Sequence, residues 1–316
     1  MKVHEIPLER RTLHGHFSPD LEPVLTVDPG DTIVFAAPDA GWGIGPPSDR
    51  AGTRERFGQR DPELDAGHPL VGPVEVRGAR AGDTLAVRID EVTVGSWGIT
   101  DAGGWSTPLN ERLGVADGEP TTVVWTLDAV AGVGRDARGR EVSLRPFLGV
   151  IGMPPAEPGV HPTSPPRTCG GNIDCKELVA GTTLFLPIAV DGALVSAGDG
   201  HAAQGDGEVS QLAIEAPIER ARLTLELREG LALATPIAWT PSAWLTLGFD
   251  EDLDEAAAKA IDAMLELMGR ELSLDRREAL AFASVVVDLR VTQLVNGVQG
   301  VHAVLAHDAV RAGRIG

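Results

Sequence analysis

The sequence predicts an α+β fold dominated by antiparallel β-sheet. Of its 316 residues, 38 are glycine and 23 are proline, whereas only 4% are aromatic and none is tyrosine. Glycine and proline divide a chain into many short segments, which is typical of sandwiches and barrels and disfavours a helical bundle. Helical periodicity is confined to the C-terminal end, so helices and strands are segregated as in α+β proteins.

The N-terminal part contains a pattern of strand, small-residue turn and strand. Residues 24–27 form an apolar run, 28–31 form an Asp-Pro-Gly-Asp turn, and 32–35 form the next run. The same pattern recurs at 74–89 and, in weaker form, at 177–188. Because the spacing is not constant, we expect repeated hairpins and not a solenoid.

Two middle segments, 36–68 and 95–120, are rich in Gly, Asp, Pro and Trp and have little periodicity. Long segments of this kind in a compact domain are typically ordered, functional loops. Residues 121–127 are expected to form a strand, and 132–139 a polar hairpin tip. In 221–228 apolar residues occupy every second position, which indicates a half-buried strand.

Two helices are expected near the C-terminus. Over 252–270 one apolar stripe follows helical spacing and consists of Ala257, Ile261, Met264, Leu265 and Met268. Gly269 is a plausible helix end, and Ser273 can cap a second helix that continues through 278–283. A final strand is expected at 301–305.

On this basis residues 1–150 form a β-rich N-terminal part. Residues 151–316 form an α+β part that carries the catalytic loops and the C-terminal helices, and we expect both parts to form one integrated unit.

Charge and cysteine content exclude several classes of function. The net charge of −19 is spread along the chain and disfavours nucleic-acid binding, because phosphates would be repelled. This acidity either keeps the protein soluble or holds a cation, and composition does not choose between the two. Two cysteines, Cys169 and Cys175, are too few for a disulfide framework. With neither a signal segment nor a membrane-length apolar run, we expect a cytoplasmic protein without membrane partners.

Polar residues that are unusual for a scaffold are concentrated at 161–208. Asp174 follows a Gly-Gly-Asn stretch, and Asp199 and His201 follow the apolar strand 184–190. We therefore expect two polar loops at the ends of buried strands, where active sites are commonly assembled.

This set of residues suits the hydrolysis of a small amide. The amide carbonyl is a poor electrophile, and a divalent cation can polarise it and lower the pKa of bound water to around 7. Asp199 and His201 lie two residues apart, so on an extended segment they point towards one ion, with Asp174 as a third ligand. Glu208 could act as general base on water and then as acid to the departing amine.

Simpler interpretations of the same residues stay open. Asp-Gly pairs at 199–200 and 206–207 are ordinary turn chemistry. An Asp-x-His pair is a weak metal signal, and His14-Gly15-His16 is best explained as structural. Cys169 is flanked by glycines and could be a nucleophile, but no activating histidine is adjacent in sequence. A second function is a non-catalytic β-sandwich module whose acidic loop holds calcium. His201 argues against it, because imidazole suits zinc better than calcium.

Several stretches are similar to the acetamidase/formamidase family. The central ones are 169–176, 181–187 and 192–209, which include the string Gly-Asp-Gly-His-Ala-Ala-Gln-Gly-Asp-Gly-Glu. Residues 28–33 and 72–79 resemble its N-terminal hairpins, and 287–296 resemble its C-terminal signature. The resemblance therefore covers essentially the whole chain.

This resemblance implies hydrolysis of short aliphatic amides, such as formamide or acetamide, to a carboxylate and ammonia. It also implies a CUB-like β-sandwich with additional α+β elements, a homo-oligomer (a dimer or higher), and a divalent metal, zinc in preference to calcium. We expect the catalytic residues to be Glu208, Asp206 and Asn172. Substrate would be bound by Gly170, Gly171, Gln204 and Cys169. The metal would be bound by Asp174, Asp199 and His201.

The chain departs from the family pattern at two places. Many members have histidine where this chain has Cys169, which would soften a metal site or change substrate contacts. The 95–120 loop, with Trp97 and Trp105, also differs. Hydrolysis of a larger or aromatic amide is therefore a further hypothesis.

Overall fold

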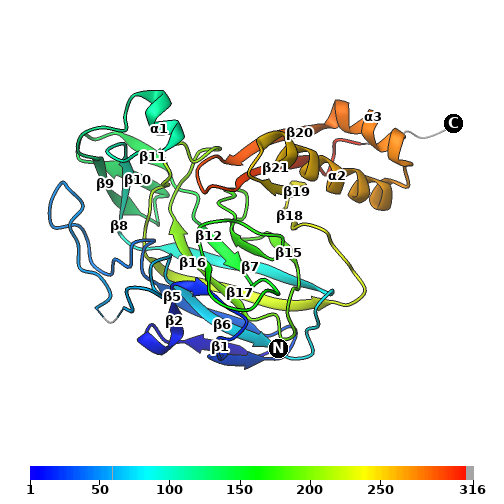
Figure 1. Cartoon of the computed structure of the whole chain (residues 1–316), viewed down its shortest axis with the longest axis horizontal. Helices are drawn as coiled ribbons and strands as arrows, with labels where there is room; N and C mark the ends of the chain where they lie inside the picture. The colour runs from blue at the N-terminus through cyan, green and yellow to red at the C-terminus, as the bar shows by residue number, and fades with distance from the viewer. Residues whose placement is uncertain (59, 311–316) are drawn as a thin grey trace.

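Two large β-sheets packed against each other make up the centre of the molecule (Figure 1). The computed structural model describes residues 1–58 and 60–310. Among the named strands of these residues, only the β1–β5 and β4–β6 pairs are parallel. The predicted α+β fold with mainly antiparallel sheet is confirmed.

The larger sheet has nine strands. Their order is β1 (Val3–Ile6), β5 (Thr32–Ala37), β17 (Ile218–Arg228), β7 (Thr84–Val94), β15 (Thr183–Pro187), β18 (Ile237–Trp239), β19 (Ala243–Asp250), β21 (Gln299–Ala306) and β20 (Val287–Gln293).

The second sheet has six strands and carries much of the chemistry described below. Its order is β14 (Gly170–Asn172), β12 (Phe147–Gly152), β16 (Val195–His201), β6 (Leu70–Val76) and β2 (Leu13–His14), and β4 (Leu25–Val27) also pairs with β6.

Smaller elements surround these sheets. They are the four-stranded sheet β11 (Glu141–Ser143), β10 (Val133–Asp136), β9 (Thr121–Asp128) and β8 (Trp97–Ala102), the pair β13 (His161–Pro162) and β3 (His16–Phe17), and the short helices η1 (Arg10–Thr12) and α1 (Pro108–Leu113).

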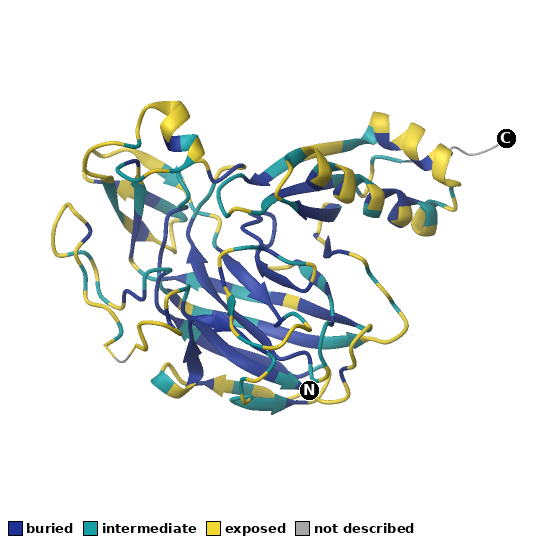
Figure 2. Ribbon diagram, viewed as in Figure 1, coloured by how far each residue is buried: buried dark blue, intermediate teal, exposed yellow. Residues whose placement is uncertain are grey.

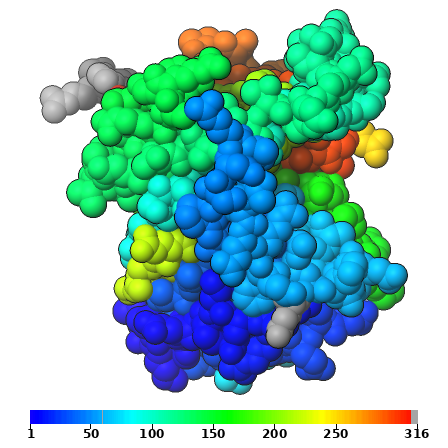
Figure 3. Space-filling model, turned by 90° about the vertical axis from the view of Figure 1, so that its left-hand side faces the viewer, coloured from blue at the N-terminus to red at the C-terminus, as the bar shows by residue number. Residues whose placement is uncertain are grey.

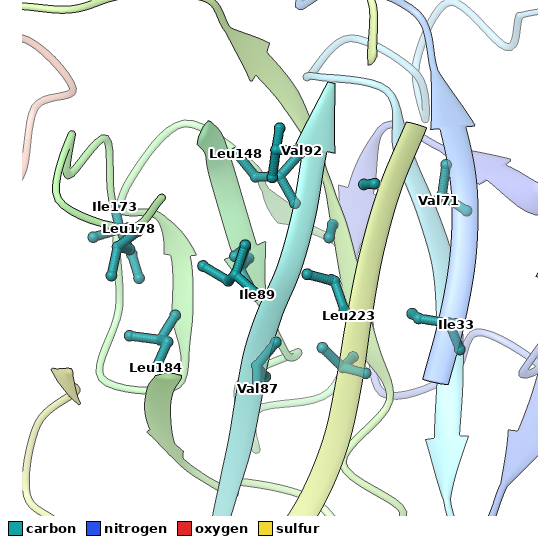
Figure 4. Packing of buried hydrophobic residues seen from close by; sticks show 14 of the residues in the cluster. Ile33, Val71, Val87, Ile89, Val92, Leu148, Ile173, Leu178, Leu184 and Leu223 are labelled. Atoms are coloured by element: carbon teal, nitrogen blue, oxygen red, sulfur yellow. The ribbon is translucent and has the colours of Figure 1, made fainter. Parts of the chain in front are cut away.

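The main core lies between the two large sheets. Figure 4 shows Ile89 of β7 and Leu223 of β17 packed towards Val71 of β6 and Leu148 of β12. All four side chains are at most 2% exposed. Complete burial of each such side chain contributes roughly 1.5–3 kcal/mol, so this layer fixes the six-stranded sheet in place.

The repeated turns are not hairpins, which corrects the prediction. β4 belongs to the six-stranded sheet, whereas β5, just after the Asp-Pro-Gly-Asp turn, belongs to the nine-stranded sheet. β6 and β7 are divided between the sheets in the same way. The turn residues set the local reversal correctly, but burial of both strands selects partners that are distant in sequence.

The 36–68 segment is an ordered loop, as predicted. Asp39 is fully buried, and its Oδ1 accepts hydrogen bonds from the amides of Gly41 and Gly43 at 2.9 and 2.7 Å. Arg54 pairs with the same carboxylate at 2.5 Å. Figure 3 shows this segment, in blue, lying over one side of the molecule.

The second predicted loop, 95–120, is not a loop throughout, because it contains β8 and α1. The predicted hairpin tip at 132–139 is partly occupied by β10.

The C-terminal helices α2 (Leu253–Leu272) and α3 (Arg276–Val286) cover one end of the larger sheet. Figure 2 shows that their outer faces are exposed while β19 and β21 beneath are buried. α2 continues past Gly269 to Leu272, and its C-cap is Ser273, whose φ is 55°. The N-cap of α3 is Asp275, which forms a capping box with Glu278, so the prediction of Ser273 as this cap was wrong. No helix among residues 1–58 and 60–310 is both long and apolar enough to cross a bilayer.

His14 on β2 makes the fold sensitive to acid. Its Nε2 lies 2.9 Å from Ser196 Oγ and its Nδ1 lies 2.5 Å from the carbonyl oxygen of His16. Burial lowers the pKa of His14 from 6.5 to about 4. Between these values the unfolded chain binds the extra proton, so stability falls as the pH drops from 6.5 to 4.

Between pH 6.5 and 4, we expect His14→Gln to remove about 3 kcal/mol of the loss in the free energy of unfolding. The slope of that free energy against pH should then correspond to about one proton fewer than in the wild type. Urea unfolding at pH 7, 5.5 and 4 measures it, with His161→Gln as the control. An unchanged slope in His14→Gln would contradict the assignment.

Candidate active site

Five buried side chains, Asp174, Asp199, His201, Glu208 and Glu215, converge beside β12 and β16, and we call them the carboxylate–histidine cluster. None is more than 6% exposed. They form two overlapping groups that share His201, and the ligand atoms within each group lie within 4.8 Å of one another. The turns around 174 and 204 thus meet at one place, although Asp199 and His201 lie within β16 itself and not in a loop.

His201 is at the centre of the cluster. Its Nε2 lies 3.3 Å from Asp199 Oδ2 and 3.3 Å from Glu215 Oε2. The ring of Phe147 packs edge-on against the imidazole, with centroids 5.0 Å apart. Two carboxylate oxygens and one imidazole nitrogen therefore converge on the same small volume.

Gln204 determines which imidazole nitrogen faces the carboxylates. Its Nε2 donates to the carbonyl oxygen of Asp174 at 2.8 Å, which leaves its Oε1 facing His201 Nδ1 at 2.9 Å. An amide oxygen can only accept, so Nδ1 carries a proton and Nε2 is the nitrogen that faces the carboxylates. Such an outer hydrogen bond is typical of metal-ligating histidines.

We therefore expect Gln204→Ala to lower metal affinity or amide turnover by roughly 10–100-fold, the usual cost of losing an outer-shell partner. The ring would lose the acceptor that fixes its orientation. Metal competition titrations and steady-state kinetics measure the effect, and Gln299→Ala is a control at the start of β21. Wild-type affinity and turnover in Gln204→Ala would rule out this positioning role.

Asp174 is held from two directions. Its amide and that of Ile173 both donate to the carbonyl oxygen of Gly149, at 3.2 and 2.9 Å. Asn296, in the turn between β20 and β21, donates through Nδ2 to Asp174 Oδ2 at 2.8 Å. The other oxygen, Oδ1, lies 4.0 Å from His201 Nδ1. The β20–β21 hairpin thus orients Oδ2 of Asp174, and Oδ1 faces the cluster.

Gly149 makes room for the cluster. A Cβ at this position would lie 2.3 Å from Asp199 Oδ2, 2.7 Å from Asp174 Oδ1 and 2.9 Å from His201 Cε1. These contacts are closer than real Cβ atoms make, so the absence of a side chain opens the space that the two carboxylates face.

Three of the carboxylates sit on unusual backbone. Asp174, Asp199 and Glu208 have φ values of 51°, 60° and 45°. A left-handed conformation costs a non-glycine residue roughly 1–3 kcal/mol, less for aspartate than for bulkier residues. Strain of this kind is concentrated at functional sites, and here it falls on the residues that bring their side chains together.

Burial and mutual charge shift the pKa values of the cluster strongly. Burial raises the pKa of Asp174 to about 7, and burial with the charge of Asp174 raises that of Glu208 well above its usual range. Burial opposes ionisation of Asp199, but His201 and His68 outweigh it and lower its pKa to about 2. The carboxylates of Glu215 and Asp199 raise the pKa of His201 despite its burial. The four carboxyl groups of the cluster thus face a single imidazole, which can balance the negative charge of only one of them.

The donor set fits a divalent cation. Four cluster oxygens are buried without a hydrogen-bond partner in the described chain: Asp174 Oδ1, Asp199 Oδ1, Glu208 Oε2 and Glu215 Oε2. Buried polar atoms of folded proteins normally have partners, so this group of oxygens is suited to bind a cation. Carboxylate oxygens around one imidazole nitrogen, above the space at Gly149, are suitable ligands for an ion.

Not every residue expected at the site lies in this cluster. Asp206 is exposed and pairs with Lys176 at 3.0 Å. Cys169 is buried, its thiol donates to the carbonyl of Met153 at 3.2 Å, and burial raises its pKa to about 11, which opposes a nucleophilic role. The Gly170 amide donates to the carbonyl of Arg167 at 3.0 Å.

Two other expected residues lie on β14. Asn172 is 3% exposed, and its Oδ1 has no hydrogen-bond partner within the part of the chain that the structure describes. Gly171 has a φ of 109°, and its carbonyl oxygen accepts from the amide of Ile173 at 3.0 Å. Both residues therefore lie next to Ile173 and Asp174 in the chain but outside the cluster.

Sequence reasoning missed Glu215, Asn296 and Gly149. Glu215 is a single charge in the apolar run 212–218, and a buried carboxylate in such a run signals a partner. Gly149 interrupts an apolar strand, which signals a close approach. Asn296 precedes Gly297 and is indistinguishable in sequence from an ordinary turn residue.

Comparison with known proteins adds to this geometry. Residues 4–160 and 158–238 match the model of the Acetamidase/Formamidase family. The chain belongs to the acetamidase/formamidase family. The match includes β12, β14 and β16 and all five residues of the carboxylate–histidine cluster, so the cluster lies in the part that defines membership.

Individual acetamidase/formamidase relatives are only moderately similar. The acetamidase of Mycolicibacterium smegmatis is 27% identical over 255 residues, which covers 62% of this chain and 61% of that protein. The formamidase of Methylophilus methylotrophus is 25% identical, over 63% of this chain and 60% of that protein. The chain thus spans less than two thirds of the length of these two curated relatives.

A solved structure of the family agrees over a longer range. The crystal structure of an acetamidase from Bacillus halodurans is 29% identical, with a TM-score of 0.81, and the match covers 95% of this chain and 97% of that one.

Proposed function

We propose that this member of the family is a metal-assisted amidohydrolase that cleaves a small linear amide to a carboxylate and ammonia. Family membership supports the reaction class. The observation that carries the proposal is the convergence of Asp199 Oδ2 and Glu215 Oε2 on His201 Nε2, each at 3.3 Å, in a buried site.

Asp199, His201 and Glu215 would hold the cation, with Asp174 on the other side of the space at Gly149. In our proposal the ion is zinc, because the imidazole at the centre suits zinc better than calcium. When bound, such an ion polarises a carbonyl and makes water a better nucleophile near neutral pH. The same imidazole argues against the calcium-binding module that the sequence left open.

Glu208 is the residue that we assign to proton transfer. Its Oε2 is buried without a partner among the described residues, and it belongs to the same group as Asp174 and His201. Its carboxylate takes a proton from the attacking water as the C–O bond forms. It then returns that proton to the amide nitrogen as the C–N bond breaks and ammonia leaves.

The Glu208 turn is fixed from outside. The amide of Gly207 donates to the carbonyl of Thr292 at 3.0 Å, and the amide of Gln211 donates to the carbonyl of Glu208 at 2.8 Å. The indole of Trp105 hydrogen-bonds to the side chain of Gln211. The connection between β8 and α1 therefore supports the turn that positions the proton carrier.

Burial favours a small substrate such as formamide or acetamide. Glu208, the most accessible member of the cluster, is only 6% exposed. A large cleft of about 860 Å³ lies elsewhere, between the 47–50 segment and the β9–β10 hairpin, and no cluster residue lines it. A bulky aromatic amide would need a larger rearrangement of this buried site than a short amide.

The test measures metal content and ammonia release together. We expect purified protein to contain zinc, to release ammonia from formamide or acetamide, to lose this activity on chelation and to regain it when zinc is added. Bound calcium with no turnover would overturn the proposal in favour of a binding module. Turnover of benzamide without turnover of the short amides would overturn the substrate class while keeping the reaction.

Two further properties belong to the same proposal. We propose a homo-oligomer, a dimer or higher, which light scattering coupled to size-exclusion chromatography would test. A cytoplasmic location is also proposed, and fractionation of the producing cells would test it.

A further inference from the structure

A second buried group of potential ligands lies apart from the carboxylate–histidine cluster. It consists of Cys175, Glu177 and His302, whose ligand atoms lie within 4.8 Å of one another. Cys175 and His302 are both 0% exposed, and Glu177 is 9% exposed. Glu177 Oε2 and His302 Nε2 lie 4.0 Å apart, too far for a hydrogen bond.

Two of these atoms have no other partner. Glu177 Oε2 and His302 Nε2 are both buried without a hydrogen bond within residues 1–58 and 60–310. A fully buried imidazole nitrogen that faces a carboxylate oxygen without reaching it leaves room for a bridging atom between them. These unpartnered atoms are an observation independent of the composition of the group, and both are suited to bind a ligand.

Neighbouring contacts select the atoms that face this space. Thr292 Oγ1 lies 2.8 Å from His302 Nδ1, so Nε2 is the nitrogen left for the group. Arg290 donates to Glu177 Oε1 at 2.9 Å, and Arg145 lies 3.8 Å from the same oxygen. Both arginines thus neutralise the oxygen that points away and leave Oε2 to face His302.

Hydrogen bonds within the chain hold the backbone that carries Cys175 and Glu177. The amide of Leu178 donates to the carbonyl of Cys175 at 2.9 Å, and the hydroxyl of Thr182 donates to the carbonyl of Glu177 at 3.1 Å. His302 comes from β21, far away in the sequence. The group therefore connects β21 with the segment that follows Asp174.

A thiol, an imidazole and a carboxylate are the three protein ligands that zinc and cobalt(II) prefer. A trapped water could bridge Glu177 and His302, but it gives no reason for a thiol in the same group. One divalent ion would balance a thiolate and one carboxylate, and the thiol proton would pass to solvent on binding.

We propose that Cys175, Glu177 and His302 form a second metal site, selective for a zinc-like ion, that braces β21 against the Asp174 segment. This site is distinct from the amide-hydrolysing centre and goes beyond the proposed function. In this proposal its role is structural. It joins β21, which follows the turn that carries Asn296, to the segment that carries Asp174, and both residues belong to the surroundings of the first site.

Cobalt(II) tests this site separately, because only this one of the two groups contains sulfur. We expect protein produced with cobalt as the supplied metal to show a near-ultraviolet thiolate-to-cobalt charge-transfer band and two metal equivalents per chain. Cys175→Ser should lose the band and one equivalent. Cys169→Ser is the matched control, since Cys169 belongs to neither group, and it should keep both.

His302→Gln provides a second variant in case Cys175→Ser does not fold, and it should weaken or abolish the band while both cysteines remain. Absence of the band in cobalt-loaded wild-type protein would overturn the second site and leave a bridging water. Loss of the band in Cys169→Ser but not in Cys175→Ser would overturn it too. A band accompanied by no amide turnover would support this site while the proposed function fails.

Discussion

Replacing Glu208 by glutamine is expected to lower kcat for formamide or acetamide by roughly 10²–10⁴-fold, the usual contribution of a positioned general base and acid. Glutamine keeps the size and the polar tip of the side chain but cannot carry a proton between water and the leaving nitrogen. The backbone of the turn, held through Gly207 and Gln211, does not depend on the carboxylate. We therefore expect KM to change much less than kcat.

Metal analysis must accompany these kinetics, because Glu208 lies within reach of Asp174 and His201. The expected variant keeps its metal and loses turnover. Glu229→Gln, a matched change at an exposed turn, should behave as wild type. Full turnover with bound metal in Glu208→Gln would remove the proton-transfer role, and loss of metal would instead make Glu208 a ligand.

The sequence predicts the secondary structure of this protein better than it predicts strand pairing. Alternation at 221–228 correctly indicates β17, and the apolar stripe from Ala257 correctly indicates α2. The turn at 28–31 is equally clear, yet the strands on either side belong to different sheets. Turn chemistry is local, whereas strand pairing depends on which distant apolar surfaces become buried together.

The same limit applies to the candidate site. Asp199 and His201 lie two residues apart, so their proximity to one another could be predicted from spacing. Glu215 reaches His201 from a separate segment, hydrogen-bonded to Ile99 of β8. The approach of that segment is a tertiary contact, and no periodicity encodes it. Asp206 shows the converse, because it lies within the family string but its side chain faces Lys176 and solvent.

Burial distinguishes carboxyl groups that lie close together in the sequence. Asp206 and Glu208 are separated by one residue, yet only Glu208 is buried with an unpartnered oxygen. Desolvation and the neighbouring Asp174 raise the pKa of Glu208, whereas a solvent-exposed carboxylate is stabilised by water. Sequence motifs select residue types, and tertiary packing decides which of these residues are buried.

Gly149→Ala is the second change for which we expect a large effect. The added methyl would lie 2.3 Å from Asp199 Oδ2 and 2.7 Å from Asp174 Oδ1, so both carboxylates must move outwards. A displacement of about 1 Å at a reacting centre can cost roughly 10²-fold in rate, and here it would also move two candidate ligands. We expect kcat/KM to fall by at least about 10²-fold, with reduced metal retention.

This variant separates the geometry of the site from the stability of the fold. The contacts of the new methyl are mainly with side-chain tips, so the six-stranded sheet should still form, and circular dichroism and thermal unfolding can verify it. Gly269→Ala adds the same methyl within α2, where it should leave turnover unchanged and stabilise the helix by roughly 0.5–1 kcal/mol. A folded Gly149→Ala protein with wild-type metal content and turnover would show that the space above Gly149 is not where the cation and the amide meet.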